Sequence, residues 1–286
     1  MMIKAETEGG YSVNIPYTFH EYRLLKIIGK GSTSVVALVE NEKNFQLYAA
    51  KIIPKDYIEY MNIMKYVQNE IKVMKEIDHP NIIKLHTTFE FKNRLGESYI
   101  VLILDYCENG DLLTYITEKG FTDENQKKKI IKKFLKGIKY LHEKGISHGD
   151  IKPENILLDE FYNPKITDFA YCHTMKIARD EDKKGTLNYA APELFTKGQF
   201  DTLQSDIWAI GITIYCLSEM NFPFKSGDEH LVIKQITTGK LCINHNIPRK
   251  LRKLIIKCTD LIPMNRPTID ELINDEYFSH QKNVRD

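Results

Sequence analysis

The stretch HGDIKPENILLD, residues 148–159, is followed at residues 165–170 by KITDFA, and these two segments decide how the chain is interpreted. Asp150 and Asn155 are five residues apart, and Asp168 follows Asn155 by thirteen. Phosphoryl transfer requires a carboxylate that orients the attacking hydroxyl and oxygen ligands that hold Mg²⁺ on the phosphates. Asp150 and Asp168 supply carboxylates, and Asn155 supplies an amide oxygen. A chance collection of acids around a proline turn accounts poorly for their joint spacing.

The composition is that of a soluble globular protein. With 286 residues, 42% hydrophobic and 28% charged, the chain can bury one large core or two modest ones. A net charge of +1 gives no reason to expect nucleic acid or an anionic membrane as a partner. The longest apolar run, YIVLIL at 99–104, is too short for a bilayer, and the start MMIKAETEGG lacks the core of a signal peptide. The cysteines lack metal or disulfide spacing, which favours a reduced intracellular setting, cytoplasmic or nuclear.

The first part of the chain has the pattern of β-strands. The segments YRLLKIIG, SVVALVE and QLYAAKII, and later NIIKLHTTFEF and SYIVLILDY, are rich in β-branched and aromatic residues. Within residues 60–78 the period changes to that of a helix, with one face formed by Ile63, Val67, Ile71 and Met74.

Helical patterns dominate after about residue 110. The segment TDENQKKKIIKKFLKGIKYLHEKG predicts a helix capped by Thr122 or Asp123, with a buried stripe of Ile130, Phe134, Ile138 and Leu141. Its lysines lie mostly opposite this stripe, which favours a solvated face over a nucleic-acid patch. SDIWAIGITIYCLSEM is apolar nearly all round and predicts a buried helix. We therefore expect a small β-rich half and a larger helical half that join near Asp105–Gly110.

Gly29 and Gly31 lie between two strand-like segments, where glycines let backbone N–H groups approach a phosphate. Ser34 stands at the third glycine position of a GxGxxG pattern, and glycine-rich hairpins are also common without ligands. Because a strand follows the glycines, a dinucleotide-binding βαβ unit is disfavoured.

Lys51 lies on the third strand-like segment, and a lysine on a strand usually points to water. The functional alternative is that its ammonium binds nucleotide phosphates and is held by a carboxylate. Glu70 is the candidate, because it shares a helix face with the apolar stripe and a carboxylate there requires a cation. A solvated Glu70 at the edge of that face is the other possibility.

In their order along the chain, these motifs resemble a eukaryotic protein kinase domain over about Tyr22–Phe278. The motifs are Gly29-Lys30-Gly31, Lys51, Glu70, HGDIKPEN, DFA, GTLNYAAPE, SDIWAIG and Arg266. The resemblance implies the α+β, bilobal protein kinase fold, with a β-rich N-lobe and a mainly helical C-lobe. The expected boundaries are an N-terminal extension at 1–21, a kinase domain at 22–279 (N-lobe about 22–105, C-lobe about 110–279) and a C-terminal tail at 280–286.

Small-molecule kinases, such as the aminoglycoside and choline kinases, also have an HGD…N loop. As families they lack the APE motif, which is present here at residues 191–193. In protein kinases the residues that match Glu193 and Arg266 form a buried ion pair with each other. The acid that matches Asp206 anchors the backbone of the catalytic loop. The later motifs therefore favour a protein kinase.

The resemblance assigns roles to individual residues. Lys152 and Thr186 match serine/threonine kinases, in which the lysine neutralises charge on the transferred phosphoryl group and the threonine bridges it to the catalytic aspartate. The implied catalytic residues are Asp150, Lys152 and Asn155, and the implied cofactors are ATP and Mg²⁺, with Asn155 and Asp168 as the metal ligands. The implied nucleotide-binding residues are Ile28, Gly29, Gly31, Ser34, Val36, Ala49, Lys51, Glu70, Leu104, Asp105, Cys107, Asp111, Leu157 and Asp168.

Three residues depart from the family pattern: Ser34 for a glycine, Ala170 for the glycine of DFG, and Gly149 for the arginine before the catalytic aspartate. None of them removes a group that touches phosphate or metal, so we predict an active ATP-dependent serine/threonine protein kinase. A nucleotide-binding pseudokinase that acts as a scaffold is the alternative. Ala170 should disfavour a flipped-out Phe169.

Gly149 removes the cation that, in related kinases, holds a phosphorylated activation loop. Between Asp168 and Glu193 the hydroxyls are those of Tyr171, Thr174, Thr186 and Tyr189. Without an arginine at 149, a phosphate on Thr174 would lack its usual anchor, so we predict a non-RD kinase that is independent of activation-loop phosphorylation. The charged run 179–184 could form internal ion pairs, although a mobile solvated tip is the preferred interpretation.

The expected partner is a protein substrate with a Ser or Thr acceptor, bound by a monomeric enzyme with no nucleic acid or membrane partner. Asp111 and Glu154 match acidic positions that contact the ribose or a basic substrate residue in several related kinases. This match predicts Arg or Lys upstream of the target hydroxyl. The segments NFPF and RPTIDELINDEYF resemble calmodulin-dependent and related kinases.

Overall fold

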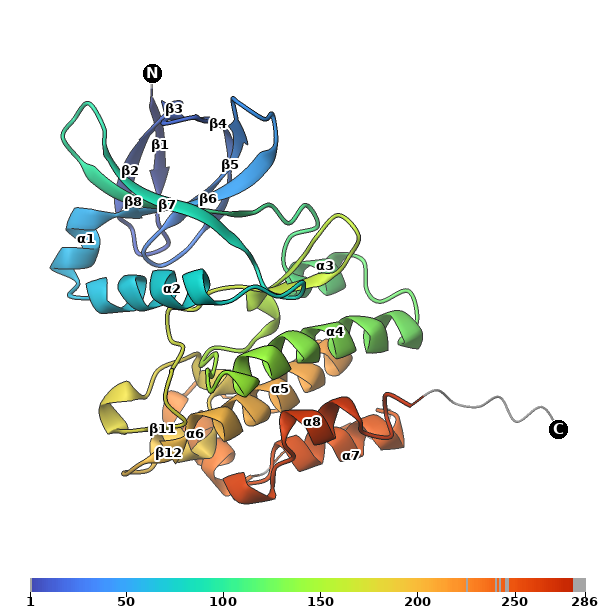
Figure 1. The fold of residues 1–286 in the computed structure, drawn as a ribbon. Helices are drawn as coiled ribbons and strands as arrows, with labels where there is room; N and C mark the ends of the chain where they lie inside the picture. Colours follow the sequence, from blue (N-terminus) through green and yellow to red (C-terminus); the bar gives the residue numbers. More distant parts are fainter. Residues whose placement is uncertain (1, 225, 240, 242, 245–246, 280–286) are drawn as a thin grey trace. The chain divides into compact units, whose positions relative to one another are not determined.

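The computed structural model describes residues 2–224, 226–239, 241, 243–244 and 247–279, and the predicted tail at 280–286 and Cys242 lie outside them. The chain divides into two compact units (Figure 1). Unit 1 comprises the residues up to His79 together with Ile83–Glu108, and unit 2 comprises Pro80–Ile82 and the residues from Asn109 onward. Because unit 1 is rich in strands and unit 2 in helices, the predicted α+β, bilobal fold is confirmed.

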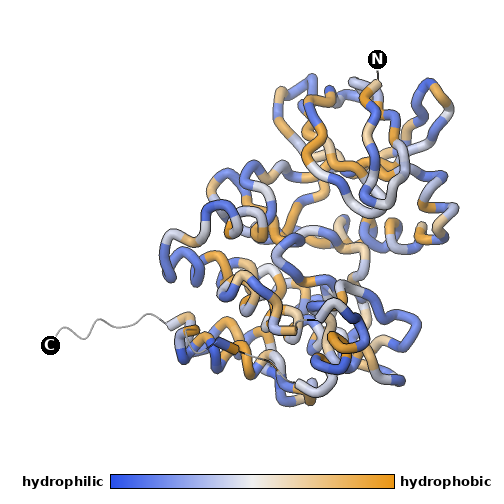
Figure 2. Tube along the Cα trace, turned by 180° about the vertical axis from the view of Figure 1, so that it is seen from behind, coloured by the Kyte–Doolittle hydropathy of each residue, from blue (hydrophilic) through white to orange (hydrophobic). Residues whose placement is uncertain are grey.

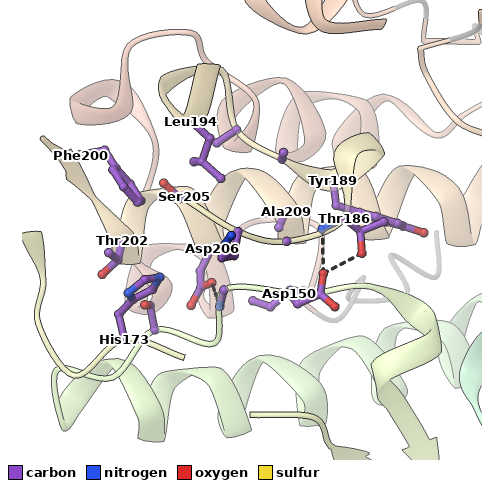
Figure 3. Close-up of a pocket in the computed structure, with 17 residues that line it drawn as sticks. Asp150, His173, Thr186, Tyr189, Leu194, Phe200, Thr202, Ser205, Asp206 and Ala209 are labelled. Atoms are coloured by element: carbon purple, nitrogen blue, oxygen red, sulfur yellow. Dashed lines mark hydrogen bonds between the residues drawn. The ribbon is translucent and has the colours of Figure 1, made fainter. Parts of the chain in front are cut away.

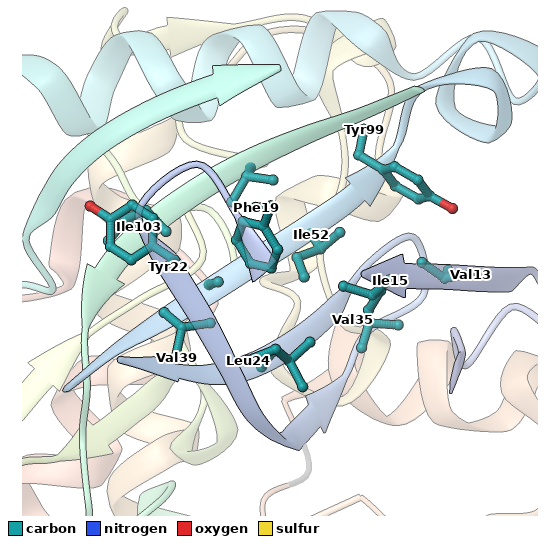
Figure 4. Close-up of a cluster of buried hydrophobic side chains, with 13 residues drawn as sticks. Val13, Ile15, Phe19, Tyr22, Leu24, Val35, Val39, Ile52, Tyr99 and Ile103 are labelled. Carbon is teal, nitrogen blue, oxygen red and sulfur yellow. The ribbon is translucent and has the colours of Figure 1, made fainter. Parts of the chain in front are cut away.

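Unit 1 is built on a six-stranded antiparallel sheet with the strand order β3-β4-β5-β6-β8-β7. The strands are β3 (Thr18–Phe19), β4 (Tyr22–Lys30), β5 (Val35–Asn41), β6 (Leu47–Pro54), β7 (Leu85–Lys92) and β8 (Ser98–Asp105). Side chains alternate between the two faces of each strand. Leu24, Val39, Ile52 and Ile103 therefore meet in one buried hydrophobic cluster on a single face (Figure 4).

Two helices follow β6 in unit 1, namely α1 (Lys55–Tyr60) and α2 (Met64–Glu76). The helix predicted within residues 60–78 is α2, and α1 was not predicted. Asn62 separates the two helices because its φ of 53° lies in the left-handed region, which a continuous helix does not allow. Val67, Glu70, Val73 and Met74 are the buried residues of α2.

The N-terminal residues form part of unit 1. Strands β1 (Met2–Glu6) and β2 (Ser12–Pro16) pair antiparallel, with Met2 opposite Pro16 and Glu6 opposite Ser12. Val13 and Ile15 of β2 belong to the same hydrophobic cluster as the main sheet (Figure 4). The hairpin is therefore packed onto the unit and does not extend from it.

Unit 2 is mainly helical. Its helices are α3 (Leu112–Glu118), α4 (Glu124–Glu143), α5 (Thr202–Glu219), α6 (Glu229–Thr238), α7 (Arg249–Cys258) and α8 (Ile269–Ile273). Short strand pairs are formed by β9 (Ile156–Leu158) with β10 (Pro164–Ile166) and by β11 (Ile177–Ala178) with β12 (Phe200–Asp201). Single 3₁₀ turns occur at η1 (Pro153–Asn155), η2 (Asp180–Asp182), η3 (Leu187–Tyr189), η4 (Pro192–Phe195) and η5 (Pro263–Asn265).

The two longest helices agree with the sequence patterns. Helix α4 is capped by Asp123, whose side chain accepts a hydrogen bond from the Gln126 backbone N–H, and the four residues of its predicted stripe are buried. Helix α5 is buried nearly all round and packs on α7. Gly211 allows this close approach, because a Cβ there would lie 2.6 Å from the Cβ of Cys258.

Hydrophobic and hydrophilic stretches alternate along the chain in both units (Figure 2). Among the described residues, none of the helices combines the length and the apolar composition needed to cross a membrane. Two lysines of α4 contact side chains that come much later in the chain. Lys128 lies over the ring of Tyr277, and Lys139 pairs with Asp270.

Candidate active site

In unit 1, Lys51 and Glu70 form a direct ion pair. The Lys51 Nζ lies 2.6 Å from Oε1 and 2.8 Å from Oε2 of Glu70, and the Glu70 carboxylate is almost completely buried. Strand β6 supplies the lysine and the core-facing side of α2 supplies the glutamate. A carboxylate at such a position is stable only when it is paired. The structure thus has the paired arrangement, in which the Lys51 ammonium is fixed on the sheet.

Apolar residues of unit 1 that are implied in nucleotide binding share a sheet face with Lys51. Val36 is the Cα partner of Lys51, and Ala49 is the Cα partner of Leu104. These residues alternate with those that enter the hydrophobic cluster, so their side chains lie on the opposite face. Val36 is half-buried and Ile28 is exposed.

The glycine-rich turn that joins β4 to β5 is closed by its own backbone. The Gly31 N–H donates to the Ser34 carbonyl at 2.8 Å. Ser34 is buried, and a Cβ on Gly31 would approach its Oγ to 3.1 Å. The serine that departs from the glycine pattern therefore packs inside the turn. At the end of β8, the Asp105 N–H donates to the Lys84 carbonyl, so this backbone N–H is already paired within unit 1.

In unit 2, Asp150 is the centre of a dense hydrogen-bond network. The Lys152 Nζ lies 2.8 Å from Asp150 Oδ2, and the Thr186 Oγ1 and N–H donate to Asp150 Oδ1 at 2.8 and 3.0 Å (Figure 3). The Lys152 ammonium also donates to Thr186 Oγ1 at 2.7 Å, and the Asn155 amide donates to Asp150 Oδ2 at 3.0 Å. The structure thus brings these four predicted residues together.

These contacts determine the charge of Asp150. Burial alone would raise the pKa of its carboxyl group, but the Lys152 ammonium and the hydrogen bonds from Lys152 and Thr186 lower the pKa below its usual value. Asp150 is therefore an ionised carboxylate at neutral pH, able to accept a hydrogen bond from an approaching hydroxyl group.

The backbone before Asp150 is anchored by Asp206 of α5. The Asp206 carboxylate (Figure 3) accepts a hydrogen bond from the Gly149 N–H at 3.0 Å. It also accepts one from the His148 N–H at 2.8 Å and lies 3.0 Å from the His142 ring. Since Asp206 is buried, these bonds are shielded from water. This is the anchoring role that the family resemblance implied.

Asp168 has a φ of 67°, which is uncommon for a residue with a side chain and occurs preferentially at functional sites. The residues on either side of Asp168 are held in place. The Thr167 N–H donates to the Asn155 carbonyl at 3.0 Å, and Phe169 is fully buried with its ring 5.2 Å from that of His148. Phe169 is thus inside the core, as expected from the alanine that follows it.

Asn155 and Asp168 supply oxygen ligands of the kind that Mg²⁺ prefers. Within the described part of the chain, no cluster of three or more His, Cys, Asp or Glu side chains could hold a metal ion. A Mg²⁺ ion that arrives with phosphate groups requires only one or two protein carboxylates or amides. The residues present therefore fit a nucleotide-borne Mg²⁺ ion.

Two other predicted residues have structural contacts. The Asp111 carboxylate caps α3 by accepting hydrogen bonds from the Thr114 N–H at 2.8 Å and the Thr114 hydroxyl at 2.7 Å, and Asp111 forms a β-bridge with Leu157. Glu154 accepts a long, 3.5 Å hydrogen bond from the Tyr189 hydroxyl.

Glu193 and Arg266 form the predicted ion pair, in which Arg266 is buried and the Glu193 carboxylate is partly buried. The Arg266 guanidinium is bidentate, with 2.7 and 2.8 Å hydrogen bonds to the two Glu193 carboxylate oxygens. It also donates to the carbonyls of Gln204 and Asp260. This pair ties the end of the activation segment (residues 168–193) to α5 and to the loop before η5.

Gly149 has a role that the sequence did not indicate. Its φ is 77°, and a Cβ at this position would lie well under 3.0 Å from the Tyr171 carbonyl oxygen. A Cβ on Gly185 would in turn lie 2.8 Å from the Gly149 carbonyl oxygen. The catalytic loop is therefore in direct backbone contact with both ends of the activation segment, and a side chain at 149 does not fit this conformation.

The comparisons with known proteins show the family to which the chain belongs. The protein kinase domain family matches residues 22–278, so the chain belongs to that family. It is 34% identical over 265 residues to 3-phosphoinositide-dependent protein kinase B of Dictyostelium discoideum, which covers 91% of this chain and 28% of the relative. It is 35% identical over 259 residues to human 3-phosphoinositide-dependent protein kinase 1, which covers 88% of this chain and 45% of the relative. It is 30% identical over 262 residues to CBL-interacting serine/threonine-protein kinase 3 of Arabidopsis thaliana, which covers 90% of this chain and 58% of the relative. The chain thus spans between about a quarter and three-fifths of the length of these relatives.

Proposed function

We propose that this protein is an ATP-dependent kinase that phosphorylates Ser or Thr hydroxyl groups of protein substrates. The observation that carries the proposal is the buried, ionised Asp150 carboxylate held by Lys152 and Thr186. A carboxylate in this setting can orient a hydroxyl group and accept its proton. The family match and the names of the serine/threonine kinases among the relatives support the same reaction.

Each set of residues has a distinct task in this reaction. In unit 1, the Lys51 ammonium binds the α- and β-phosphates, and Glu70 keeps it in place. In unit 2, Asp150 orients the acceptor hydroxyl, and Lys152 offsets the charge that develops on the transferred phosphoryl group. Asn155 and Asp168 would hold Mg²⁺, which when bound supplies positive charge to the phosphate oxygens.

The decisive experiment measures phosphate transfer from labelled ATP to a generic basic protein. The Asp150→Asn variant should lose transfer, because an amide cannot take up the proton. Asp123→Asn is the matched control, since asparagine caps a helix as well as aspartate and Asp123 lies in the same unit. Equal labelling by wild type and Asp150→Asn would identify a contaminating kinase. An absence of labelling with both would support the pseudokinase scaffold.

We also propose that activity does not require phosphorylation of the activation segment. Ser147 and His173 exchange backbone hydrogen bonds at 3.0 and 3.1 Å, β11 pairs with β12, and the Thr202 N–H donates to the Lys176 carbonyl at 2.8 Å. These backbone contacts order the segment without any phosphate.

The charged run 179–184 contributes to the same ordering. Internal ion pairing is supported by Asp180, which lies 2.7 Å from the Lys183 Nζ and accepts a hydrogen bond from the Gly198 N–H at 3.0 Å. Lys183 also donates to the Thr196 carbonyl. The tip of the segment is thus tied to the residues just beyond it.

The hydroxyl groups of the segment differ in their surroundings. Thr186 is bonded to Asp150 and Tyr189 is buried, whereas Thr174 is exposed and is the residue of this set most open to a modifying kinase. Phosphatase-treated wild type and Thr174→Ala should both keep the full turnover number. Loss of turnover in either preparation would refute this part of the proposal.

For the substrate, we propose a preference for Arg or Lys upstream of the acceptor hydroxyl, read by Glu154 and Asp111. The Asp111 carboxylate is shared with the α3 cap, so Glu154 is the main candidate. A peptide array should show enrichment of basic residues, and Glu154→Gln should reduce this enrichment.

We further propose that the enzyme acts in a reducing compartment, since the four described cysteines are buried thiols and not disulfides. We also propose that it is a monomer. Sedimentation at micromolar concentration tests the monomer.

A further inference from the structure

We propose that the N-terminal hairpin, residues 2–16, is a built-in clamp that positions the glycine-rich turn for nucleotide binding. The hairpin lies outside the family match, which begins at residue 22. Its turn contacts the glycine-rich turn directly, and its second strand is buried in the core of unit 1. The inference rests on the proposed function only where it assigns nucleotide binding as the purpose of the clamp. The contacts between the two turns do not depend on that function.

The direct contact is made by Glu8 and Gly9. The Glu8 backbone N–H donates to the Gly31 carbonyl at 2.9 Å. A Cβ on Gly9 would lie 2.6 Å from the Ser32 carbonyl oxygen and 2.7 Å from the Tyr57 hydroxyl oxygen. Since real Cβ atoms do not approach so closely, residue 9 must be glycine for the two turns to meet. The clamp thus acts on the backbone of the residues between Gly29 and Ser34.

The turn that makes this contact is itself rigid. The Gly10 N–H donates to the Thr7 carbonyl and the Thr7 N–H to the Tyr11 carbonyl, each at 3.0 Å. The Tyr11 N–H donates to the Thr7 hydroxyl at 3.1 Å. The Tyr11 ring stacks on Tyr57 of α1 with 4.6 Å between the centroids. The internal hydrogen bonds keep the shape of the Thr7–Tyr11 turn, and moving it away from the glycine-rich turn would break the Tyr11–Tyr57 stacking and the Glu8–Gly31 hydrogen bond.

The second strand anchors the hairpin in the core. Val13 and Ile15 are both 0% exposed in the cluster that also contains Val35 and Tyr99 (Figure 4). Full burial removes both side chains from water, which stabilises the contact of the hairpin with the rest of unit 1.

A polar network reinforces the anchor. The Asn14 N–H donates to the Tyr99 hydroxyl at 3.2 Å, and Asn93 donates to the Asn14 carbonyl at 2.9 Å. Asn14, Asn93 and Tyr99 all donate to the Glu97 carboxylate. Burial alone would raise the pKa of Glu97, but these three hydrogen bonds lower it, so the network is intact at neutral pH.

The test removes one hydrogen-bond donor without removing the turn. Glu8 is the second residue of the Thr7–Gly10 turn, its φ is negative, and proline is well tolerated there. Glu8→Pro deletes the N–H that binds Gly31 and puts a ring carbon in its place, against the Gly31 carbonyl, whereas the matched control Glu8→Ala retains the N–H. Gly9→Ala is a second variant that opens the same contact by steric conflict.

Hydrogen exchange of residues 29–34 and the affinity for an unhydrolysable ATP analogue with Mg²⁺ are the readouts. In Glu8→Pro, exchange should rise and affinity should fall by at least about three- to tenfold, because one hydrogen bond is lost and the proline ring conflicts with the Gly31 carbonyl. Glu8→Ala should stay at wild-type values. Gly9→Ala should behave like Glu8→Pro. Thermal unfolding of each variant verifies that unit 1 is folded.

Each outcome bears on the clamp separately from the kinase activity. If the chain transfers no phosphate, hydrogen exchange and nucleotide affinity still test the clamp. If the chain binds no nucleotide, hydrogen exchange alone tests whether the hairpin holds the glycine-rich turn. Exchange in residues 29–34 that is the same in Glu8→Pro, Gly9→Ala and wild type would overturn the inference. Faster exchange with unchanged nucleotide affinity would overturn the positioning role.

Discussion

Replacing Gly149 by alanine tests how the catalytic loop and the activation segment depend on each other. Two penalties apply to Gly149→Ala. The first is the left-handed backbone, which costs a residue with a side chain roughly 1–2 kcal/mol. The second is the conflict between the new Cβ and the Tyr171 carbonyl oxygen, which would be well under 3.0 Å apart. Overpacking of this kind costs about 1–3 kcal/mol.

Gly120→Ala is a matched control for the first penalty. Gly120 has a φ of 69° against 77° for Gly149, and no atom lies within 4 Å of the Cβ that would be added. Both variants also lose the same chain flexibility in the unfolded state. The difference between their free energies of unfolding therefore isolates the conflict with Tyr171, and we expect about 1–3 kcal/mol.

Thermal unfolding and steady-state kinetics are the assays. A difference of this size should lower the melting temperature of Gly149→Ala below that of Gly120→Ala by roughly 2–5 °C. Because Gly149 precedes Asp150, a shift of the loop by about 1 Å should also lower kcat, by up to about a hundredfold. If Gly149→Ala matches Gly120→Ala in both stability and kcat, the proposed contact between the two segments is wrong.

Three further predictions concern single residues. Arg266→Met should destabilise the protein by about 3–5 kcal/mol in denaturant titrations, because the partly buried Glu193 carboxylate loses its bidentate partner; a shift below 1 kcal/mol would contradict this. Lys152→Ala should move the acidic limb of the pH profile of kcat/KM to higher pH, because Lys152 lowers the pKa of Asp150 and Asp150 must be ionised to act. An acidic limb at unchanged or lower pH would show that another group controls it. Burial raises the pKa of Cys258 to about 12, so its thiol should resist alkylation at neutral pH until the protein unfolds, as mass spectrometry can follow; rapid labelling of the native protein would disagree.

The elements whose signal is local could be predicted from the sequence. The stripe of Ile130, Phe134, Ile138 and Leu141 and the cap at Asp123 define α4, because a helix repeats over neighbouring residues. Asp150, Lys152 and Asn155 are close in sequence, so their motif was recognisable, and the match to the family supplied Lys51, Glu70 and Arg266.

Other features depended on contacts between distant residues. The sequence left open whether the N-terminal residues pack on the domain, and α1 and the αL position of Asn62 were not foreseen. The partners that hold β2 lie far along the chain: Asn14 and Tyr99 are 85 residues apart. A periodic pattern within residues 2–16 cannot indicate a hydrogen bond to a residue so far along the chain.

Gly149 shows the same division. From the sequence, it was a missing arginine, and that observation sufficed to predict independence from activation-loop phosphorylation. Only the folded chain showed that the Tyr171 carbonyl fills the space where any side chain would begin. By itself, the sequence determined the fold class and the chemical groups available, because these follow from local patterns and from ordered motifs. The tertiary structure decided which backbone groups meet, because hydrogen bonds and steric contacts between distant segments exist only after the chain has folded.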